Sequence, residues 1–382
     1  MKRIYFDYAS TTPIDPPVIK AMEPYLFEKF GNPSSPHHAG REAKKALENS
    51  RETLAFFLGA TPEEIVFTSG GSESNNQAIC GMARSLKSQG NHLILSKIEH
   101  HSVLEPARYL EKEGFKITLV PVDQYGVVNP EDIKNAITAK TILIALIHAS
   151  NEIGTIQDAA AVGKLCIERG IYFHVDAIQT VGHLPVKVDK MGCHTLSLAA
   201  HKFYGPKGVG ALYIRRGTRV ENYLLGGDQE RGRRASTQNV AGAVGLAKAI
   251  ELCQTQMEEE IKTQIFLRNR LITEIPRRID QCLLNGHPTQ RLPNNVHFSF
   301  ASLTGESLLM SLDMIGIASS MGSACTAGSL KASHVLKAIG LSDELAFAAL
   351  RISIGRWTTL EEVDYFLDQL PEIVQRLRVA NV

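Results

Sequence analysis

Between about residues 60 and 215 the sequence alternates short β-rich runs with stretches of helical periodicity. The helical stretches include an amphipathic pattern at 79–86 and an Asn129–Pro130 pair, which is typical of an N-cap followed by the first helical position. This alternation predicts a mainly parallel sheet with helices on both faces, and ligands of such sheets bind beyond the carboxyl ends of the strands. The expected strands lie at 64–69, 92–100, 116–122, 141–150, 171–179, 195–202 and 209–216.

The regions on either side of this alternation have a different pattern, and they predict two domains in the 382-residue chain. A helical arm precedes the alternation, and its second helix is expected to stop at Gly59. A long helix with a polar face, at roughly 256–275, leads into a mixture of strands and helices. We therefore expect an α/β fold with a large domain at 16–257, built on a seven-stranded sheet, and a smaller α+β domain formed by 1–15 and 258–382.

Composition and charge narrow the class of protein. The formal net charge of +1 gives no electrostatic case for a nucleic acid or a membrane surface as partner. The N-terminal residues lack the apolar core of a signal peptide, and the longest aliphatic run, 142–147, is far shorter than a membrane span. The cysteines form no CxxC pair, which argues against an intrinsic metal site or a disulfide framework and favours a cytoplasmic protein with reduced thiols.

Unusual polar residues follow two of the expected strands. Gly71 and Ser72 lie between a strand and a helix, where backbone N–H groups and a hydroxyl could hold a phosphate; the alternative is an ordinary strand-to-helix turn. Asp176 and Gln179 end another apolar strand. A carboxylate buried there needs a strong donor, either a cation such as a protonated pyridine nitrogen or a set of loop amides.

Three further strand ends carry candidate residues. An imidazole at His100 could stack on an aromatic cofactor and transfer protons, although a lone histidine is more often structural. Asn151 offers a side-chain amide to a ligand after the most apolar strand. Lys202 is either a surface lysine or an amine that condenses with a carbonyl group. Together with Asp176 and a phosphate-type turn, Lys202 completes the residue set of a Schiff-base cofactor site, and His201 could reach the phosphate.

The second domain contributes a thiol and a guanidinium. Cys325 lies in "ASSMGSACTAGSL", a run of small residues that predicts a loop with a nucleophilic, partly exposed thiol. Cys80, Cys166 and Cys253 fall instead in apolar helical patterns, and we interpret them as packing residues. Arg351, within a short strand, either grips a carboxylate with two N–H groups or forms a buried structural ion pair.

These segments match the motifs of one protein family. The sequence resembles the cysteine desulfurases of the iron–sulfur cluster assembly and nitrogen-fixation type, which belong to the class V aminotransferase group of fold-type I pyridoxal-phosphate enzymes. The resemblance covers nearly the whole chain, and the cysteine loop separates desulfurases from aminotransferases of the same fold. The matching segments are "DYASTTP", "FGNPSS", "FTSGGSESNN", "EHHSVLE", "NEIGTIQD", "HVDAIQT", "HKFYGPKGVGALY", "GGDQERGRRAST", "GSACTAGS" and "RISIGRWTT".

The resemblance implies a cofactor, pyridoxal 5'-phosphate, and residues that hold it. Lys202 would form a Schiff base with it, Asp176 would pair with the pyridine nitrogen, and Gln179 would contact the ring hydroxyl. His100 would stack on the ring and handle protons. The implied phosphate ligands are Gly71, Ser72, His201 and, from the other subunit of a homodimer, Thr237.

The resemblance also implies the reaction. Asn151, which would contact the cofactor as well, and Arg351 would hold the carboxylate of L-cysteine. After a ketimine of the cofactor forms, Cys325 would attack the substrate sulfur, which leaves a persulfide on the enzyme and releases L-alanine. The sulfur would pass to a scaffold or relay protein for iron–sulfur cluster assembly or thiolation. Cys325 could then be a transient ligand of an acceptor-bound cluster.

The sequence departs from the family pattern at three places. Ala199 stands where the family commonly has a serine two residues before the His–Lys pair, so one phosphate hydroxyl is missing and weaker cofactor binding is expected. Met321 replaces a serine directly before the glycine of the cysteine loop, which is expected to alter loop mobility or partner contact. The last residue, Val382, follows the final helix closely, so the scaffold docking through a further tail that several assembly-type relatives use is not carried over to this chain.

Two other functions share much of this residue set. A selenocysteine lyase or another β-eliminating enzyme would use the same lysine and aspartate, but "GSACT" supplies a sulfur acceptor and favours a desulfurase. A sulfur-relay protein with little turnover would bind no cofactor, so visible absorbance of the purified protein distinguishes it from both enzymes.

Overall fold

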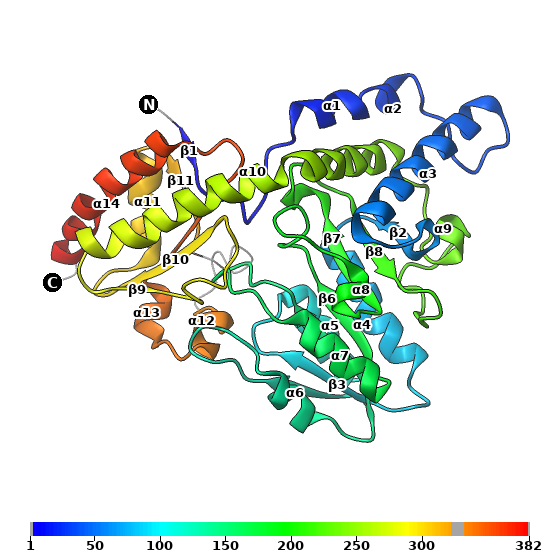
Figure 1. Ribbon diagram of the computed structural model, residues 1–382, viewed down its shortest axis with the longest axis horizontal. Coiled ribbons are helices and arrows are strands. Elements are labelled where there is room, and N and C mark those ends of the chain that lie inside the picture. The colour runs from blue at the N-terminus through cyan, green and yellow to red at the C-terminus, as the bar shows by residue number, and fades with distance from the viewer. Residues whose placement is uncertain (1–2, 322–331, 381–382) are drawn as a thin grey trace.

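The computed structural model describes residues 3–321 and 332–380, and its largest element is a seven-stranded sheet (Figure 1). The strand order is β2-β8-β7-β6-β5-β3-β4. Only β8 runs antiparallel to its neighbours β2 and β7, so the sheet is mainly parallel. Each predicted strand is present: β2 (Ile65–Thr68), β3 (His92–Ser96), β4 (Lys116–Val120), β5 (Thr141–Ile147), β6 (Tyr172–Asp176), β7 (Thr195–Ala199) and β8 (Gly210–Ile214).

Helices cover both faces of this sheet, as the alternating pattern predicts. Side chains of successive strand residues point to opposite faces: in β5, Leu143 belongs to the core cluster that includes residues of α4 and α5, and Ile144 to the cluster that includes residues of α3 and α7. The helical arm is also confirmed, and Gly59 ends α3 in the left-handed conformation with φ 73°. The helices are α1 (Pro16–Met22), α2 (Pro24–Phe27), α3 (His38–Leu58), α4 (Gly71–Ser85), α5 (His101–Glu111), α6 (Pro130–Ala136), α7 (Ala159–Arg169), α8 (Val188–Met191) and α9 (Gln229–Gly232), with 3-10 turns η1 (Pro62–Glu64) and η2 (Ala200–Lys202).

The C-terminal part of the chain forms a second core around a three-stranded antiparallel sheet, β12-β10-β9. A parallel pair, β1 and β11, brings the N-terminal residues to this core. The elements are β1 (Ile4–Tyr5), β9 (Cys282–Leu284), β10 (Asn295–Phe300), β11 (Ile317–Ala318) and β12 (Ala349–Ser353), with α11 (Gly305–Met314), α12 (His334–Ala338), α13 (Asp343–Phe347) and α14 (Leu360–Ala380).

A single helix, α10 (Val240–Arg278), runs from one core to the other (Figure 1). It is longer than the predicted helix at 256–275. Its first turns are rich in Ala and Gly and are buried against the large sheet's helices, so they show no polar face to reveal a helix in the sequence. We propose that the domain boundary lies inside α10, because Cys253 belongs to the first core and Leu267 to the second. Below, the large domain is 16–257 and the small domain is 1–15 with 258–382.

The N-terminal segment, residues 7–15, links the two domains. Asp7 pairs with Ser353 of β12, whereas Thr12 and Asp15 donate backbone hydrogen bonds to the carbonyls of His201 and Tyr204. Residues 9 and 10 are therefore held beside the end of β7. Within the described ranges, no helix is long and apolar enough to cross a membrane, and no group of three His, Cys, Asp or Glu side chains could hold a metal ion.

Candidate active site

A cavity of about 280 Å³ opens at the carboxyl ends of the parallel strands, between the large sheet and the small domain. This is the edge at which the strand pattern predicts a ligand site. Cys325 lies outside the described residues, and Thr237 is exposed and does not line this cavity in the described part of one chain. The lining contains every other candidate residue: Gly71, Ser72, His100, Asn151, Asp176, Gln179, His201, Lys202 and Arg351.

Asp176 is the last residue of β6, and its carboxylate is buried at the floor of the cavity. One oxygen accepts a hydrogen bond from the backbone N–H of Ile178 at 3.0 Å, and the other accepts one from Asn75 Nδ2 at 2.8 Å. Burial raises the pKa of this carboxyl, while these bonds and the charge of Lys202 act in the opposite direction. A cation placed against Asp176 would therefore stabilise its ionised form.

Asn75 connects Asp176 to two histidines, and the sequence analysis gave it no role. Its Nδ2 also donates to Ser102 Oγ at 2.8 Å, and its Oδ1 lies 3.0 Å from His174 Nε2. Ser102 Oγ in turn lies 2.7 Å from Nδ1 of His100. The sequence signal was available, because Asn75 stands inside the quoted "FTSGGSESNN" segment, but a helical asparagine has no distinctive chemistry until its partners are known.

His100 is the N-cap of α5, and its Nδ1 accepts a hydrogen bond from the Ser102 backbone N–H at 3.1 Å. The backbone N–H and the Ser102 hydroxyl both point to Nδ1, which places the proton of the neutral imidazole on Nε2. Burial and the charge of Lys202 lower the pKa of His100 to about 4. His100 is therefore neutral at pH 7 and can accept a proton only when a stronger acid or a negative charge is brought beside it.

Lys202 ends the 3-10 turn that follows β7, and this turn aims its amine into the cavity. Lys202 Nζ donates to the carbonyls of Ala9 and Ser10, both at 2.7 Å. The backbone carbonyl of Lys202 lies 2.9 Å from His183 Nε2, and this contact helps to hold the turn in place. Lys202 is thus a half-buried amine held near the floor, and the alternative of a surface lysine is excluded.

The predicted phosphate turn lies at the cavity. It opens the 15-residue helix α4, and its residues Gly71 and Ser72 line the cavity at the helix N-terminus, the end that carries the positive side of the helix dipole. A Cβ on Gly71 would lie 2.2 Å from Cδ1 of Ile178, so a larger residue there would have to displace the Ile178 side chain. The same Cβ position is 3.7 Å from Cβ of Ala199, which places the side chain at residue 199 beside this turn. His201 is held by a 3.2 Å contact between Nδ1 and Thr11 Oγ1.

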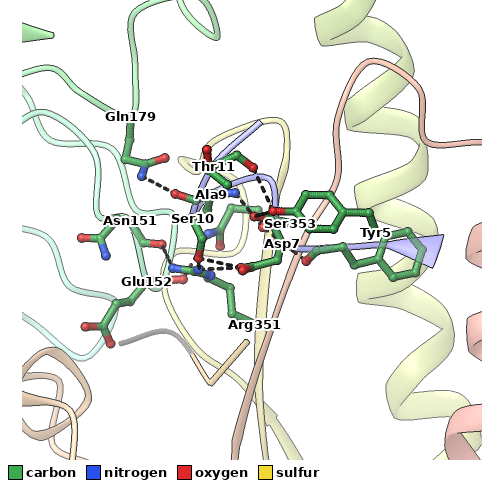
Figure 2. A network of polar contacts seen from close by, with 12 residues as sticks. Tyr5, Asp7, Ala9, Ser10, Thr11, Asn151, Glu152, Gln179, Arg351 and Ser353 are labelled. Atoms are coloured by element: carbon green, nitrogen blue, oxygen red, sulfur yellow. Dashed lines mark hydrogen bonds and ion pairs between the residues drawn. The ribbon is translucent and has the colours of Figure 1, made fainter. Parts of the chain in front are cut away.

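Arg351 lies on β12 at the opposite side of the cavity and is 1% exposed. Its Nη2 donates to Asp7 Oδ1 at 2.8 Å and to Ser10 Oγ at 2.7 Å, and its Nη1 donates to the Asn151 carbonyl at 2.8 Å (Figure 2). The ion pair with Asp7 confirms that Arg351 has a structural role, which was one of the two alternatives that the sequence left open. Arg351 also lines the cavity wall.

Two buried carboxyl groups near the site were missed by the sequence analysis. Glu152 lines the cavity and accepts a hydrogen bond from Ser333 Oγ at 2.5 Å. Glu99 lies behind His100, where it accepts bonds from Ser96 Oγ and the Ile147 N–H, and burial raises its pKa to about 8. Both follow apolar runs at strand ends, which is the signal that identified Asp176.

Comparison with known proteins identifies the family. Residues 4–366 match the class V aminotransferase family model, and the chain belongs to this family. It is 53% identical to "Cysteine desulfurase IscS" of Dictyoglomus turgidum, over the whole of this chain and 97% of the relative. It is 50% identical to the protein of the same name from Methanosarcina thermophila, over 99% of this chain and 93% of that protein.

Known structures give the same result. A structure named "NIFS-like protein" superposes with a TM-score of 0.93 at 38% identity, over 98% of this chain and the whole of the other. "SspA in complex with cysteine" superposes with a TM-score of 0.80 at 35% identity, over 94% of this chain and the whole of the other. The expected family, the α/β fold and the cysteine desulfurase class of enzyme are confirmed by these matches.

Proposed function

We propose that this protein converts L-cysteine to L-alanine with pyridoxal 5'-phosphate, and that it passes the sulfur atom through Cys325 to an acceptor protein. The observation that carries the proposal is the convergence, in one cavity, of a lysine amine, a buried carboxylate and a helix N-terminus. Its full-length relatives named cysteine desulfurase support the same activity.

The residues present fit the cofactor. Asp176 provides a buried carboxyl group with a raised pKa, and a pyridinium N–H would stabilise its ionised form. The Gly71–Ser72 turn lines the cavity at the N-terminus of α4, where backbone N–H groups and the Ser72 hydroxyl can bind a phosphate. Lys202 provides the amine, and Gln179 and His201 stand beside these groups. When bound, pyridoxal phosphate supplies an electron sink that makes the Cα–H bond of an amino acid acidic. Asp176 keeps that sink effective, and Lys202 and neutral His100 accept and return the protons.

The substrate side is supplied by the other wall of the cavity. Arg351 offers a guanidinium to the carboxylate of L-cysteine, and Asn151 stands next to it at the end of the large-domain loop.

Sulfur transfer is assigned to Cys325 on the strength of the family resemblance. The Cys325 thiolate forms a bond to the sulfur of L-cysteine as the substrate's Cβ–S bond breaks. The Cβ carbon gains a proton, so the products are L-alanine and a persulfide at Cys325. We further propose a homodimer in which Thr237 of one subunit completes the phosphate site of the other, a cytoplasmic location, and a scaffold or relay protein as the sulfur acceptor.

The first experiment is a single incubation of the purified holoprotein with L-cysteine, followed by mass spectrometry of alanine and of the Cys325 peptide. We expect equimolar alanine and persulfide in the first turnover, and visible absorbance of the protein before substrate is added. Cys325→Ser should abolish the persulfide. Cys282→Ser is the matched control, because Cys282 lies on β9 away from the cavity and should leave both products unchanged.

The other outcomes identify the alternatives. Alanine released from selenocysteine but not from cysteine would contradict the proposal and indicate a selenocysteine lyase. A colourless protein that accepts a persulfide from a donor but forms no alanine would indicate a sulfur-relay protein.

A further inference from the structure

The loop that carries Asn151 belongs to the large domain by sequence, but its backbone is held by the small domain. This loop, Asn151–Gly154, follows β5 of the large sheet. Arg351 Nη1 donates to the carbonyl of Asn151 at 2.8 Å, and Asn295 Nδ2 donates to the carbonyl of Glu152 at 3.1 Å. Both donors lie on the paired strands β10 and β12 of the small domain.

The next two carbonyls of the loop are held in the same way. Arg291 Nη2 donates to the carbonyl of Ile153 at 2.8 Å, and the backbone N–H of Leu292 donates to that of Gly154 at 2.9 Å. Successive carbonyls from 151 to 154 therefore all accept hydrogen bonds from the small domain. The N–H groups of residues 152–154 bond instead to Ser150 of the large domain, so the loop is held from both sides and the small domain fixes the carbonyl side, including that of Asn151.

Arg291 is the centre of this arrangement. It is 2% exposed, and its other hydrogen bonds go to the carbonyls of Asn295 (3.1 Å, from Nε) and Asn285 (3.1 Å, from Nη2). Within residues 3–321 and 332–380, the side-chain hydrogen bonds of Arg291 thus go to backbone carbonyls. Burial and the charge of Arg268 lower the pKa of Arg291 to about 9, so the guanidinium remains charged at pH 7.

The energetics of Arg291 argue for a specific role. Burying a guanidinium is costly, and carbonyl dipoles compensate a charge less well than a carboxylate does. An apolar side chain would fill the same space without that cost, but it could not join the large-domain carbonyl of Ile153 to two small-domain carbonyls. The rigid guanidinium fork can do this, because its N–H groups point in fixed, divergent directions.

Two glycines allow the close approach that these bonds require. Gly154 has φ +77°, and a Cβ there would lie 2.7 Å from Oδ1 of Asn295. Gly286 has φ +85°, and a Cβ there would lie 2.4 Å from the carbonyl oxygen of Ile153, the acceptor of the Arg291 bond. The backbone on both sides of the domain contact is therefore shaped around the same hydrogen bonds.

We propose that Arg291 and Asn295 are positioning residues that fix the Asn151 loop to the small domain and thereby set the distance between Asn151 and Arg351. This proposal rests on the proposed function, in which Asn151 and Arg351 hold the substrate carboxylate. Neither positioning residue lines the cavity in the described part of the chain, so both act through the loop. They control affinity for the amino-acid substrate rather than the chemistry at Lys202.

The test compares Arg291→Lys and Asn295→Ala with a matched control, Arg268→Lys. Arg268 is 6% exposed and also donates to backbone carbonyls, those of residues 291 and 292, but it makes no bond to the 151–154 loop. In the holoenzyme, the Arg291 and Asn295 variants should raise KM for L-cysteine by about fivefold or more and leave kcat within about twofold, as expected for loss of uniform substrate binding. The Arg268 variant should leave KM unchanged.

A second measurement separates this proposal from the proposed function. Hydrogen exchange of the peptide covering 150–157, measured without substrate, should be faster in the Arg291 and Asn295 variants than in wild type and in Arg268→Lys. Wild-type protein that forms no alanine would overturn the proposed function, whereas the exchange result would still test the loop contact. Unchanged KM and unchanged exchange in Arg291→Lys, or an equal rise of KM in Arg268→Lys, would overturn the positioning role.

Discussion

The two walls of the cavity are built in different ways. The strand-end wall consists of Gly71, Ser72, His100, Asp176 and Lys202, and each of these residues ends a strand of one sheet or lies shortly after its end. The interdomain wall consists of Ser10, Asn151 and Arg351, whose contacts join residues 200 and 341 positions apart (Figure 2). The first wall follows from sheet topology alone, whereas the second exists only when the two domains are packed together.

This difference separates two tasks. A sheet edge is rigid, which suits groups that must hold a cofactor at a fixed angle for every reaction cycle. A wall shared between domains changes whenever the domains shift, which suits groups that must bind and release a substrate. Changes in the strand-end wall should therefore affect cofactor chemistry, and changes in the interdomain wall should affect substrate affinity.

The largest effect is expected from Lys202→Ala in the strand-end wall. Loss of a positioned proton-transfer group lowers rates by about 10²–10⁴-fold, so alanine formation should fall by at least that factor. The visible absorbance of the purified protein should change at the same time. The loss should be in kcat rather than in KM. A variant that retains more than a tenth of wild-type kcat would contradict the assignment of Lys202.

Arg351→Lys tests the interdomain wall. Lysine keeps the charge but loses the planar fork, and hydrogen bonds to charged groups contribute about 1.5–3 kcal/mol, so KM for L-cysteine should rise about tenfold to a hundredfold. Steady-state kinetics measure this change, and the absorbance of bound cofactor serves as the control because it should match wild type. A fall in kcat with unchanged KM would show that the two walls do not divide the tasks as proposed.

His174, which contacts Asn75 next to the strand-end wall, should make the stability of the protein depend on pH. Burial lowers the pKa of His174 from 6.5 to about 3. Between these values the unfolded chain binds a proton that the folded protein does not, so stability is present above pH 6.5 and is lost as the pH falls toward 3. The slope for this one group approaches about 1.4 kcal/mol per pH unit.

Urea unfolding of the wild type and of His174→Gln at pH 7, 6 and 5 measures that slope. The variant is expected to be less stable at pH 7 but to lose less stability on acidification. Equal slopes in the two proteins would show that His174 is protonated in the folded state as readily as in the unfolded chain.

The smallest effect is expected from Ala199→Ser. Residue 199 lies beside the Gly71 turn, and an added hydroxyl there supplies one more donor to a bound phosphate. A hydrogen bond of this kind contributes about 0.5–1.5 kcal/mol, so the dissociation constant of pyridoxal phosphate should fall about twofold to tenfold. Dialysis followed by absorbance measures how much cofactor each protein retains. Ala200→Ser, at the next buried position, is the control. Weaker cofactor binding in Ala199→Ser would indicate that the space is already filled.

Local pattern was enough to predict much of the fold. Each β-rich run became a strand of the large sheet, and Asn129 caps α6 by accepting from the Glu131 N–H at 3.0 Å, as the Asn–Pro signal predicts. The same patterns placed Asp176 and Lys202 at strand ends, because a mainly apolar run marks a buried strand and the polar residues after it mark where the strand stops.

Two features could not be predicted in this way. The first turns of α10, residues 240–247, contain only Val, Ala, Gly and Leu and so show no polar face. Asn75 is one of several polar residues on a helix until Asp176 and Ser102 are brought against it. Both depend on contacts with distant segments rather than on their own sequence.

The sequence by itself determined the strands, the helix caps and the chemical groups at the sheet edge, because hydrophobic periodicity and capping act over a few residues. Only the tertiary structure decided how Asn151, Arg291 and Arg351 meet. Their bonds run from side chains to backbone carbonyls, and a carbonyl is the same in every residue, so no sequence pattern can mark which one will be bound. The interdomain wall is therefore a property of the folded molecule.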